Sequence, residues 1–70
     1  MTKQEAQTVK DRVVGHWRNT RIAHEPGIID PSDGEDFGFF VTAQDHDGRV
    51  VQWSSPHVDR AEYVFRQVWS

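Results

Sequence analysis

The first third of the chain carries mostly apolar residues at steps of three and four: Ala6, Val9, Val13, Trp17 and Thr20. This spacing places their side chains on one stripe of an α-helix. We therefore predict a first helix from about residue 3 to residue 23, which Pro26 and Gly27 end. Gly15 lies inside this helix and predicts a kink or a close backbone contact there.

The middle of the chain has the strongest local signal, two β-type segments joined by a tight turn. The segments are residues 37–43 and 49–54, and the turn is Asp45-His46-Asp47-Gly48. A type I turn closed by a glycine bulge predicts the pairs Gln44 with Val50, Ala43 with Val51, Thr42 with Gln52 and Val41 with Trp53. This register gives a core face with Phe37, Phe39, Val41, Ala43, Val51 and Trp53. The second face carries Gly38, Phe40, Thr42, Val50 and Gln52.

The segment from His24 to Asp36 is rich in proline, glycine and acids, yet it contains Ile28 and Ile29. A fully solvated loop would not need two isoleucines, so we expect them to enter the core. Pro31 stands where a type I turn favours proline. Residues 27–30 are therefore a candidate third strand, and the sequence leaves this open.

The end of the chain has the signals of a second helix. Ser55 and Pro56 fit the N-cap and first helical position, although Asp59 followed by Glu62 would form a capping box slightly later. One helical arc then holds Ala61, Val64, Phe65, Val68 and Trp69. We predict one small α+β domain, residues 1–70, of order α-β-β-α or α-β-β-β-α. Its two helices pack on one face of an antiparallel hairpin or three-stranded sheet.

Length and composition limit how this domain is stabilised and where it works. The chain has 70 residues and no cysteine, and a domain of this size buries only about 60% of its unfolded surface. Without disulfides, homodimerisation is the remaining common way to stabilise so small a core. The lack of cysteine, of an apolar leader and of a membrane-spanning segment predicts a cytoplasmic protein.

Charge is distributed unevenly around the formal net charge of −3. No lysine or arginine occurs between Arg21 and Arg49, a stretch that holds seven acids: Glu25, Asp30, Asp33, Glu35, Asp36, Asp45 and Asp47. Residues 1–21 instead carry five basic side chains against two acids. This distribution excludes a strongly basic nucleic-acid-binding protein and indicates an acidic central surface.

No arrangement of residues favours catalysis or metal binding. Ser55, His57 and Asp59 occupy alternate positions, where their side chains do not form a nucleophile relay. The histidines lack the i, i+4 spacing of a zinc helix, and the aspartates near Gly48 lack the ligand alternation of a calcium loop. We predict that the protein is not an enzyme and has no metal and no cofactor.

The favoured function is a protein-interaction module of the adaptor or inhibitor type, with a homodimer left open. Phe40 remains outside the core on the second hairpin face, and contiguous exposed apolar residues indicate a binding surface. The acidic segment would meet a basic partner surface, for example the groove of a nucleic-acid-binding protein. The predicted contact residues are Phe40, Thr42, Val50, Asp30, Asp33, Glu35 and Asp36.

Direct nucleic-acid binding is the alternative. An α-β-β-β-α chain of this length has the topology of the double-stranded-RNA-binding domain, and the resemblance ends there. Where such domains present lysines, this chain has Ser55-Pro56-His57-Val58-Asp59. Phosphate contacts would then come from one flank of the first helix, through Lys3, Lys10, Arg18 and Arg21.

Overall fold

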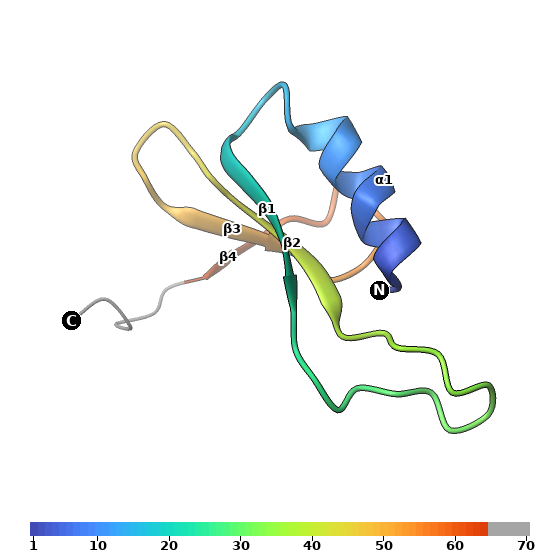
Figure 1. Cartoon of the computed structure of the whole chain (residues 1–70). Helices are drawn as coiled ribbons and strands as arrows, with labels where there is room; N and C mark the ends of the chain where they lie inside the picture. Colours follow the sequence, from blue (N-terminus) through green and yellow to red (C-terminus); the bar gives the residue numbers. More distant parts are fainter. Residues whose placement is uncertain (65–70) are drawn as a thin grey trace.

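The structure, a computed structural model, describes residues 1–64 as one helix packed on a four-stranded antiparallel sheet (Figure 1). The elements are helix α1 (Lys3–Val13) and strands β1 (Arg18–His24), β2 (Phe39–Gln44), β3 (Val50–Trp53) and β4 (Glu62–Val64). The strands lie in the sheet in chain order, β1-β2-β3-β4. The predicted α+β class is confirmed, whereas the order of the described elements is α-β-β-β-β instead of either predicted order.

Helix α1 begins at a capping box and is half as long as predicted. The Glu5 amide donates to Thr2 Oγ1 at 3.2 Å, and the Thr2 amide donates to Glu5 Oε1 at 2.9 Å. The two bonds satisfy amides that the first helical turn leaves without partners. Ala6, Val9 and Val13 are buried, as the periodicity predicts.

The prediction that this helix continues to residue 23 is wrong. A turn at residues 14–16 follows α1, and residues 18–24 form strand β1 beside β2. Gly15 favours the break, and the β-branched Thr20 and Ile22 suit a strand. The start of β1 is irregular, because its register with β2 shifts between Arg18 and Arg21 and Asn19 adopts a φ of 50°. These are the marks of a β-bulge.

The hairpin prediction is confirmed pair by pair. Strand β2 pairs with β3 in the register Gln44 with Val50, Ala43 with Val51, Thr42 with Gln52 and Val41 with Trp53. Gly48 has a φ of 82°, the left-handed conformation that a glycine bulge requires. The Asp45 amide donates to the Arg49 carbonyl at 3.0 Å, so these two residues face each other as expected.

The second predicted helix is not present in the residues that the structure describes. Residues 62–64 instead form the edge strand β4, in which Val64 pairs with Val50 and Tyr63 with Val51. A β-branched and an aromatic residue favour strand pairing once an open edge of β3 is available. Three residues of the predicted arc, Phe65, Val68 and Trp69, lie outside the described residues.

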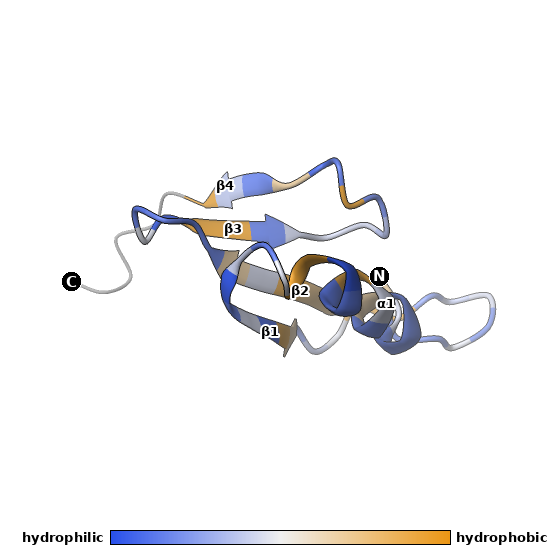
Figure 2. Ribbon diagram, turned by 90° about the horizontal axis from the view of Figure 1, so that it is seen from above, coloured by the Kyte–Doolittle hydropathy of each residue, from blue (hydrophilic) through white to orange (hydrophobic). Residues whose placement is uncertain are grey.

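The core lies between the sheet and α1. Its buried residues are Met1, Ala6, Val9, Val13, Val41, Ala43, Val51 and Trp53. Figure 2 shows α1 lying over the β1–β2 side of the sheet. Val58 and Ala61, from the segment between β3 and β4, pack on the same core. One sheet face is therefore covered by α1 and by residues 54–61.

The first residue ties this core to the sheet. The ammonium nitrogen of Met1 donates to the carbonyls of Phe37 at 2.9 Å, Phe39 at 3.0 Å and Ser54 at 3.4 Å. In return, the Phe39 amide donates to the Met1 carbonyl at 3.1 Å. These bonds hold the start of α1 against the beginning of β2 and the end of β3.

Candidate protein-interaction surface

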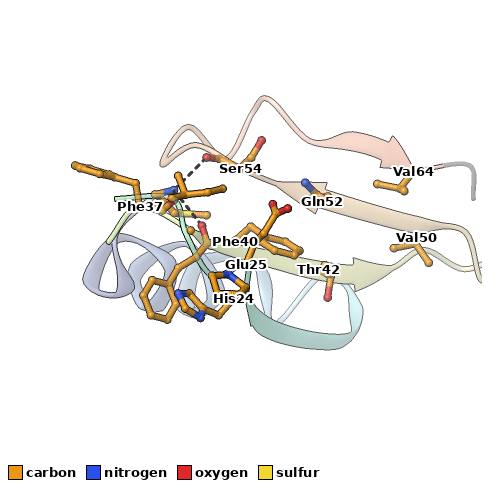
Figure 3. Close-up of a pocket in the computed structure, with 14 residues that line it drawn as sticks. His24, Glu25, Phe37, Phe40, Thr42, Val50, Gln52, Ser54 and Val64 are labelled. Atoms are coloured by element: carbon orange, nitrogen blue, oxygen red, sulfur yellow. Dashed lines mark hydrogen bonds between the residues drawn. The ribbon is translucent and has the colours of Figure 1, made fainter. Parts of the chain in front are cut away.

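The sheet face opposite α1, called here the outer face, has no helix packed on it in the part of the chain that the structure describes. By strand register it carries Arg21, Ala23, Phe40, Thr42, Val50, Gln52, Glu62 and Val64. Phe40, Thr42, Val50, Gln52 and Val64 line a single open groove of about 490 Å³ (Figure 3). The predicted grouping of Phe40, Thr42 and Val50 on one face is thus confirmed.

The groove continues onto the first residues of a projecting segment. Residues 25–38, called here the acidic arm, leave β1 and return to β2 as a narrow protrusion from the sheet (Figure 1). Glu25, Pro26 and Ile28 line the same groove as Phe40. The acidic arm and the outer face therefore form one continuous surface.

Backbone bonds between its two sides give the acidic arm a defined shape. The Glu25 amide donates to the Gly38 carbonyl at 2.8 Å, the Phe37 amide to the Ile28 carbonyl at 2.9 Å, and the Asp30 amide to the Glu35 carbonyl at 2.8 Å. Only one isolated bridge forms, between Ile29 and Asp36. Residues 27–30 are thus half of a closed loop and do not form the third strand.

The two isoleucines of the acidic arm do not enter the core. Ile28 and Ile29 are 46% and 49% exposed, so this prediction is wrong. The arm is a two-sided protrusion that extends beyond the sheet (Figure 1), and it lies away from the apolar layer under α1. Its apolar side chains are consequently exposed next to its acids.

Two of the four predicted contact acids, Asp30 and Asp33, fold the arm through their side chains. The hydroxyl and amide of Ser32 donate to Asp30 Oδ1 at 2.7 and 2.8 Å and lower the pKa of Asp30. The Glu35 amide donates to Asp33 Oδ1 at 2.9 Å. Such side-chain acceptors stabilise turns by replacing backbone partners. The carboxylates of half-buried Asp30 and exposed Asp33 are therefore structural, whereas Glu35 is exposed and contributes its backbone to the arm.

Asp36 joins the arm to the sheet. The Gly38 amide donates to Asp36 Oδ1 at 2.8 Å, and this bond is the main cause that lowers the pKa of Asp36. His24 Nε2 lies 2.6 Å from Asp36 Oδ2, and the His24 ring rests on Phe39 with 4.3 Å between ring centroids. The end of β1 is therefore held to the end of the arm by a hydrogen bond and a ring contact.

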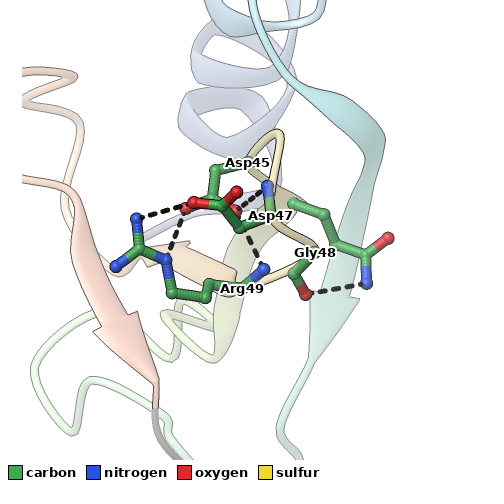
Figure 4. A network of polar contacts seen from close by, with 5 residues as sticks. Asp45, Asp47, Gly48 and Arg49 are labelled. Carbon is green, nitrogen blue, oxygen red and sulfur yellow. Dashed lines mark hydrogen bonds and ion pairs between the residues drawn. The ribbon is translucent and has the colours of Figure 1, made fainter.

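The tip of the β2–β3 hairpin is organised by one carboxylate (Figure 4). Asp45 Oδ1 accepts from the amides of Asp47 and Arg49, each at 2.9 Å, and Asp45 Oδ2 lies 2.9 Å from Arg49 Nε. Partial burial would by itself raise the pKa of Asp45, but the bonds from Arg49 and Asp47 outweigh it and lower that pKa. The Arg49 guanidinium also lies over the Tyr63 ring, 5.0 Å from its centroid, so the turn is linked to β4.

We expect Asp45→Asn to lower the midpoint of thermal unfolding by several degrees at neutral pH. A carboxyl with a lowered pKa stabilises the fold above its unfolded pKa of about 3.8, and this contribution is lost as the pH falls through the folded pKa. The difference between wild type and Asp45→Asn should therefore shrink in acid. Calorimetry across this pH range measures it. Asp47→Asn is the matched control, since the Asp47 side chain is 77% exposed and its contact with Arg49 Nη2 is longer, at 3.5 Å. An equal loss of stability in the control would contradict the prediction.

The four predicted basic contact residues do not form one helix flank. Lys3 and Lys10 lie on α1, whereas Arg18 and Arg21 lie on β1. Arg21 pairs with Thr42 and so belongs to the outer face, on the opposite side of the sheet from α1. Nucleic-acid binding through these residues stays an untested prediction, and the four residues do not share one helix as that prediction requires.

Nothing in the described residues points to a metal site or to a membrane span. Within residues 1–64, no three histidine or acidic side chains are grouped as metal ligands would be. In the same part of the chain, no helix combines the length and apolar character that crossing a bilayer requires.

Comparison of the chain with protein-family models, with curated proteins and with solved structures finds no significant match. Four residues of the outer face lie on strands that the sequence analysis did not predict: Arg21, Ala23, Glu62 and Val64. They join the outer face only because β1 and β4 are strands. For β4, the aromatic Tyr63 and the β-branched Val64 are the sequence features that favour a strand.

Proposed function

We propose that the protein is a small cytoplasmic interaction module, of the adaptor or inhibitor type, whose partner protein binds the outer face and the base of the acidic arm. The observation that carries the proposal is the difference between the two sheet faces. One is covered by α1 and residues 54–61, while the outer face keeps half-buried Phe40, Val50 and Val64 around an open groove. Contiguous apolar side chains of this kind are typical of binding surfaces.

The acidic arm supports a partner with a basic surface. Residues 25–36 carry Glu25, Asp30, Asp33, Glu35 and Asp36 and no lysine or arginine. Because Glu25 lines the groove, a partner seated on Phe40 would also meet this charge. Opposite charge on the partner would increase the association rate and favour one orientation.

The test is a pull-down from the native host with wild type and Phe40→Asp. A carboxylate in the middle of the apolar groove should abolish capture, since it would be buried without a partner at the interface. Val14→Asp is the matched control because Val14 is 53% exposed and follows α1, on the covered side of the sheet. Circular dichroism of both variants checks that each one is folded before the pull-down. Equal capture by wild type and Phe40→Asp would exclude the outer face as the binding surface.

A further inference from the structure

One row of side chains crosses the whole outer face. The registers place Arg21 beside Thr42, Thr42 beside Gln52, and Gln52 beside Glu62. Paired residues in neighbouring antiparallel strands project to the same face, so this row runs from edge strand β1 to edge strand β4. It begins with a positive charge and ends with a negative one.

These two charges do not meet within the chain. Three strand spacings of about 4.8 Å separate the ends of the row, roughly 14 Å in all. Among the described residues Arg49 pairs with Asp45 and Asp47, and His24 Nε2 contacts Asp36, so neither Arg21 nor Glu62 is paired there. Both side chains are exposed. The outer face thus presents two opposite charges at one level of the sheet and at opposite edges.

We propose that the outer face binds a second copy of this chain about a two-fold axis parallel to the strands. This inference rests on the proposed function, because it uses the same outer face, and it takes a second copy of the chain as the molecule that binds there. Such an axis exchanges β1 with β4 and β2 with β3. Arg21 of each copy then faces Glu62 of the other, and Thr42 faces Gln52, each twice. An axis perpendicular to the strands in the plane of the interface would instead place Arg21 against Arg21, which like-charge repulsion disfavours.

The side chains beside the row supply the apolar contact. Phe40 lies on one side of it, and Val50 and Val64, which pair with each other, lie on the other. Aligned packing of two sheets buries such residues between them. A stable interface needs about 800 Å² from each partner, and the whole chain exposes 5197 Å². The outer face, on which no helix packs within residues 1–64, is the source that we propose for that area.

The small core gives a physical reason for this association. Among the described residues only eight hydrophobic residues are buried, and none of them is a phenylalanine. A chain of 70 residues with no cysteine has few other means of removing apolar surface from water. Covering Phe40, Val50 and Val64 with a second copy adds a second apolar layer.

The test is a pair of charge reversals measured by sedimentation velocity over a wide range of concentrations. Wild type should approach twice the monomer mass of 8.1 kDa. Arg21→Glu alone and Glu62→Arg alone should each weaken the dimer by about tenfold or more, because each creates two like-charge contacts. An equimolar mixture of the two variants should dimerise again, since every contact in the mixed dimer then joins opposite charges. The double variant should likewise recover.

Matched controls change the same charges elsewhere. Arg12 on α1 and Asp59 between β3 and β4 are exposed. Arg12→Glu and Asp59→Arg should therefore leave the dimer unchanged. A wild type that stays monomeric, reversals without effect, or a mixture that fails to recover would each overturn the two-fold arrangement. The proposed function and the proposed dimer can fail separately. If wild type is monomeric but captures a host partner that Phe40→Asp does not capture, the proposed function stands and self-association is excluded.

Discussion

Replacing Trp53 with alanine is expected to lower the free energy of unfolding by about 3–5 kcal/mol. A domain of this length has a total stability of roughly 4–10 kcal/mol, so the variant should lose between about a third and all of it. Trp53 is 1% exposed at the centre of the core. Its ring meets Trp17 edge-on with centroids 5.3 Å apart, and its Nε1 donates to the Val58 carbonyl at 2.9 Å. The change therefore leaves a cavity and also frees residues 54–61 from the sheet.

Urea denaturation followed by circular dichroism measures this effect. Trp53→Phe keeps most of the ring but loses the N–H donor, so we expect an intermediate loss that remains measurable if the alanine variant does not fold. Trp17→Ala is the matched control, because Trp17 is only half-buried at the edge of the core. A loss of less than about 1 kcal/mol in Trp53→Ala would mean that the core does not depend on this residue.

The central hairpin could be predicted because the information for it is local. The turn residues Asp45 and Gly48 select the bulge, and the bulge sets the pairing of the residues on either side. Alternation then separates buried Val41, Val51 and Trp53 from Phe40 and Val50. The placement of Phe40, Thr42 and Val50 on one face followed from that register alone.

Strand β1 could not be predicted because its identity depends on a distant segment. Trp17 and Thr20 continue the helical spacing of Ala6, Val9 and Val13, so periodicity favoured one long helix. The structure stops α1 at Val13 and uses the following residues to pair with β2, which lies more than a dozen residues further along the chain. Pairing with the open edge of β2 thus overrides the helical preference that the spacing of Trp17 and Thr20 indicates.

The sequence analysis missed strand β4 for the same reason, and with it one edge of the outer face. Ser55 and Pro56 resemble a helix start, yet the segment that follows packs Val58 and Ala61 on the core and enters the sheet at Glu62. Only this arrangement aligns Glu62 with Gln52 and, across the sheet, with Arg21. The charge pattern of the outer face is therefore a property of the sheet and has no counterpart in the linear sequence.

Replacing Gly38 with alanine is expected to open the base of the acidic arm at a cost of about 2–4 kcal/mol. Gly38 is buried where the arm returns to β2, and a β-carbon there would collide with the backbone carbonyl oxygen of Glu25. The backbone of β1 and that of β2 would have to separate at this point. The separation would break the 2.8 Å bond from the Glu25 amide to the Gly38 carbonyl and weaken the 2.8 Å bond from the Gly38 amide to Asp36.

Amide hydrogen exchange tests this directly, because the amides of Glu25, Phe37 and Gly38 should lose protection before those of β3. Gly15→Ala is the matched control: an added β-carbon at Gly15 meets no atom within 4 Å and its φ is not positive, so stability should be unchanged or slightly higher. Equal stability of the two variants would show that the close approach at Gly38 is not maintained in solution. If Gly38→Ala instead behaves as expected but still captures the host partner, the outer face binds without a closed arm, and the acids of the arm act by charge more than by position.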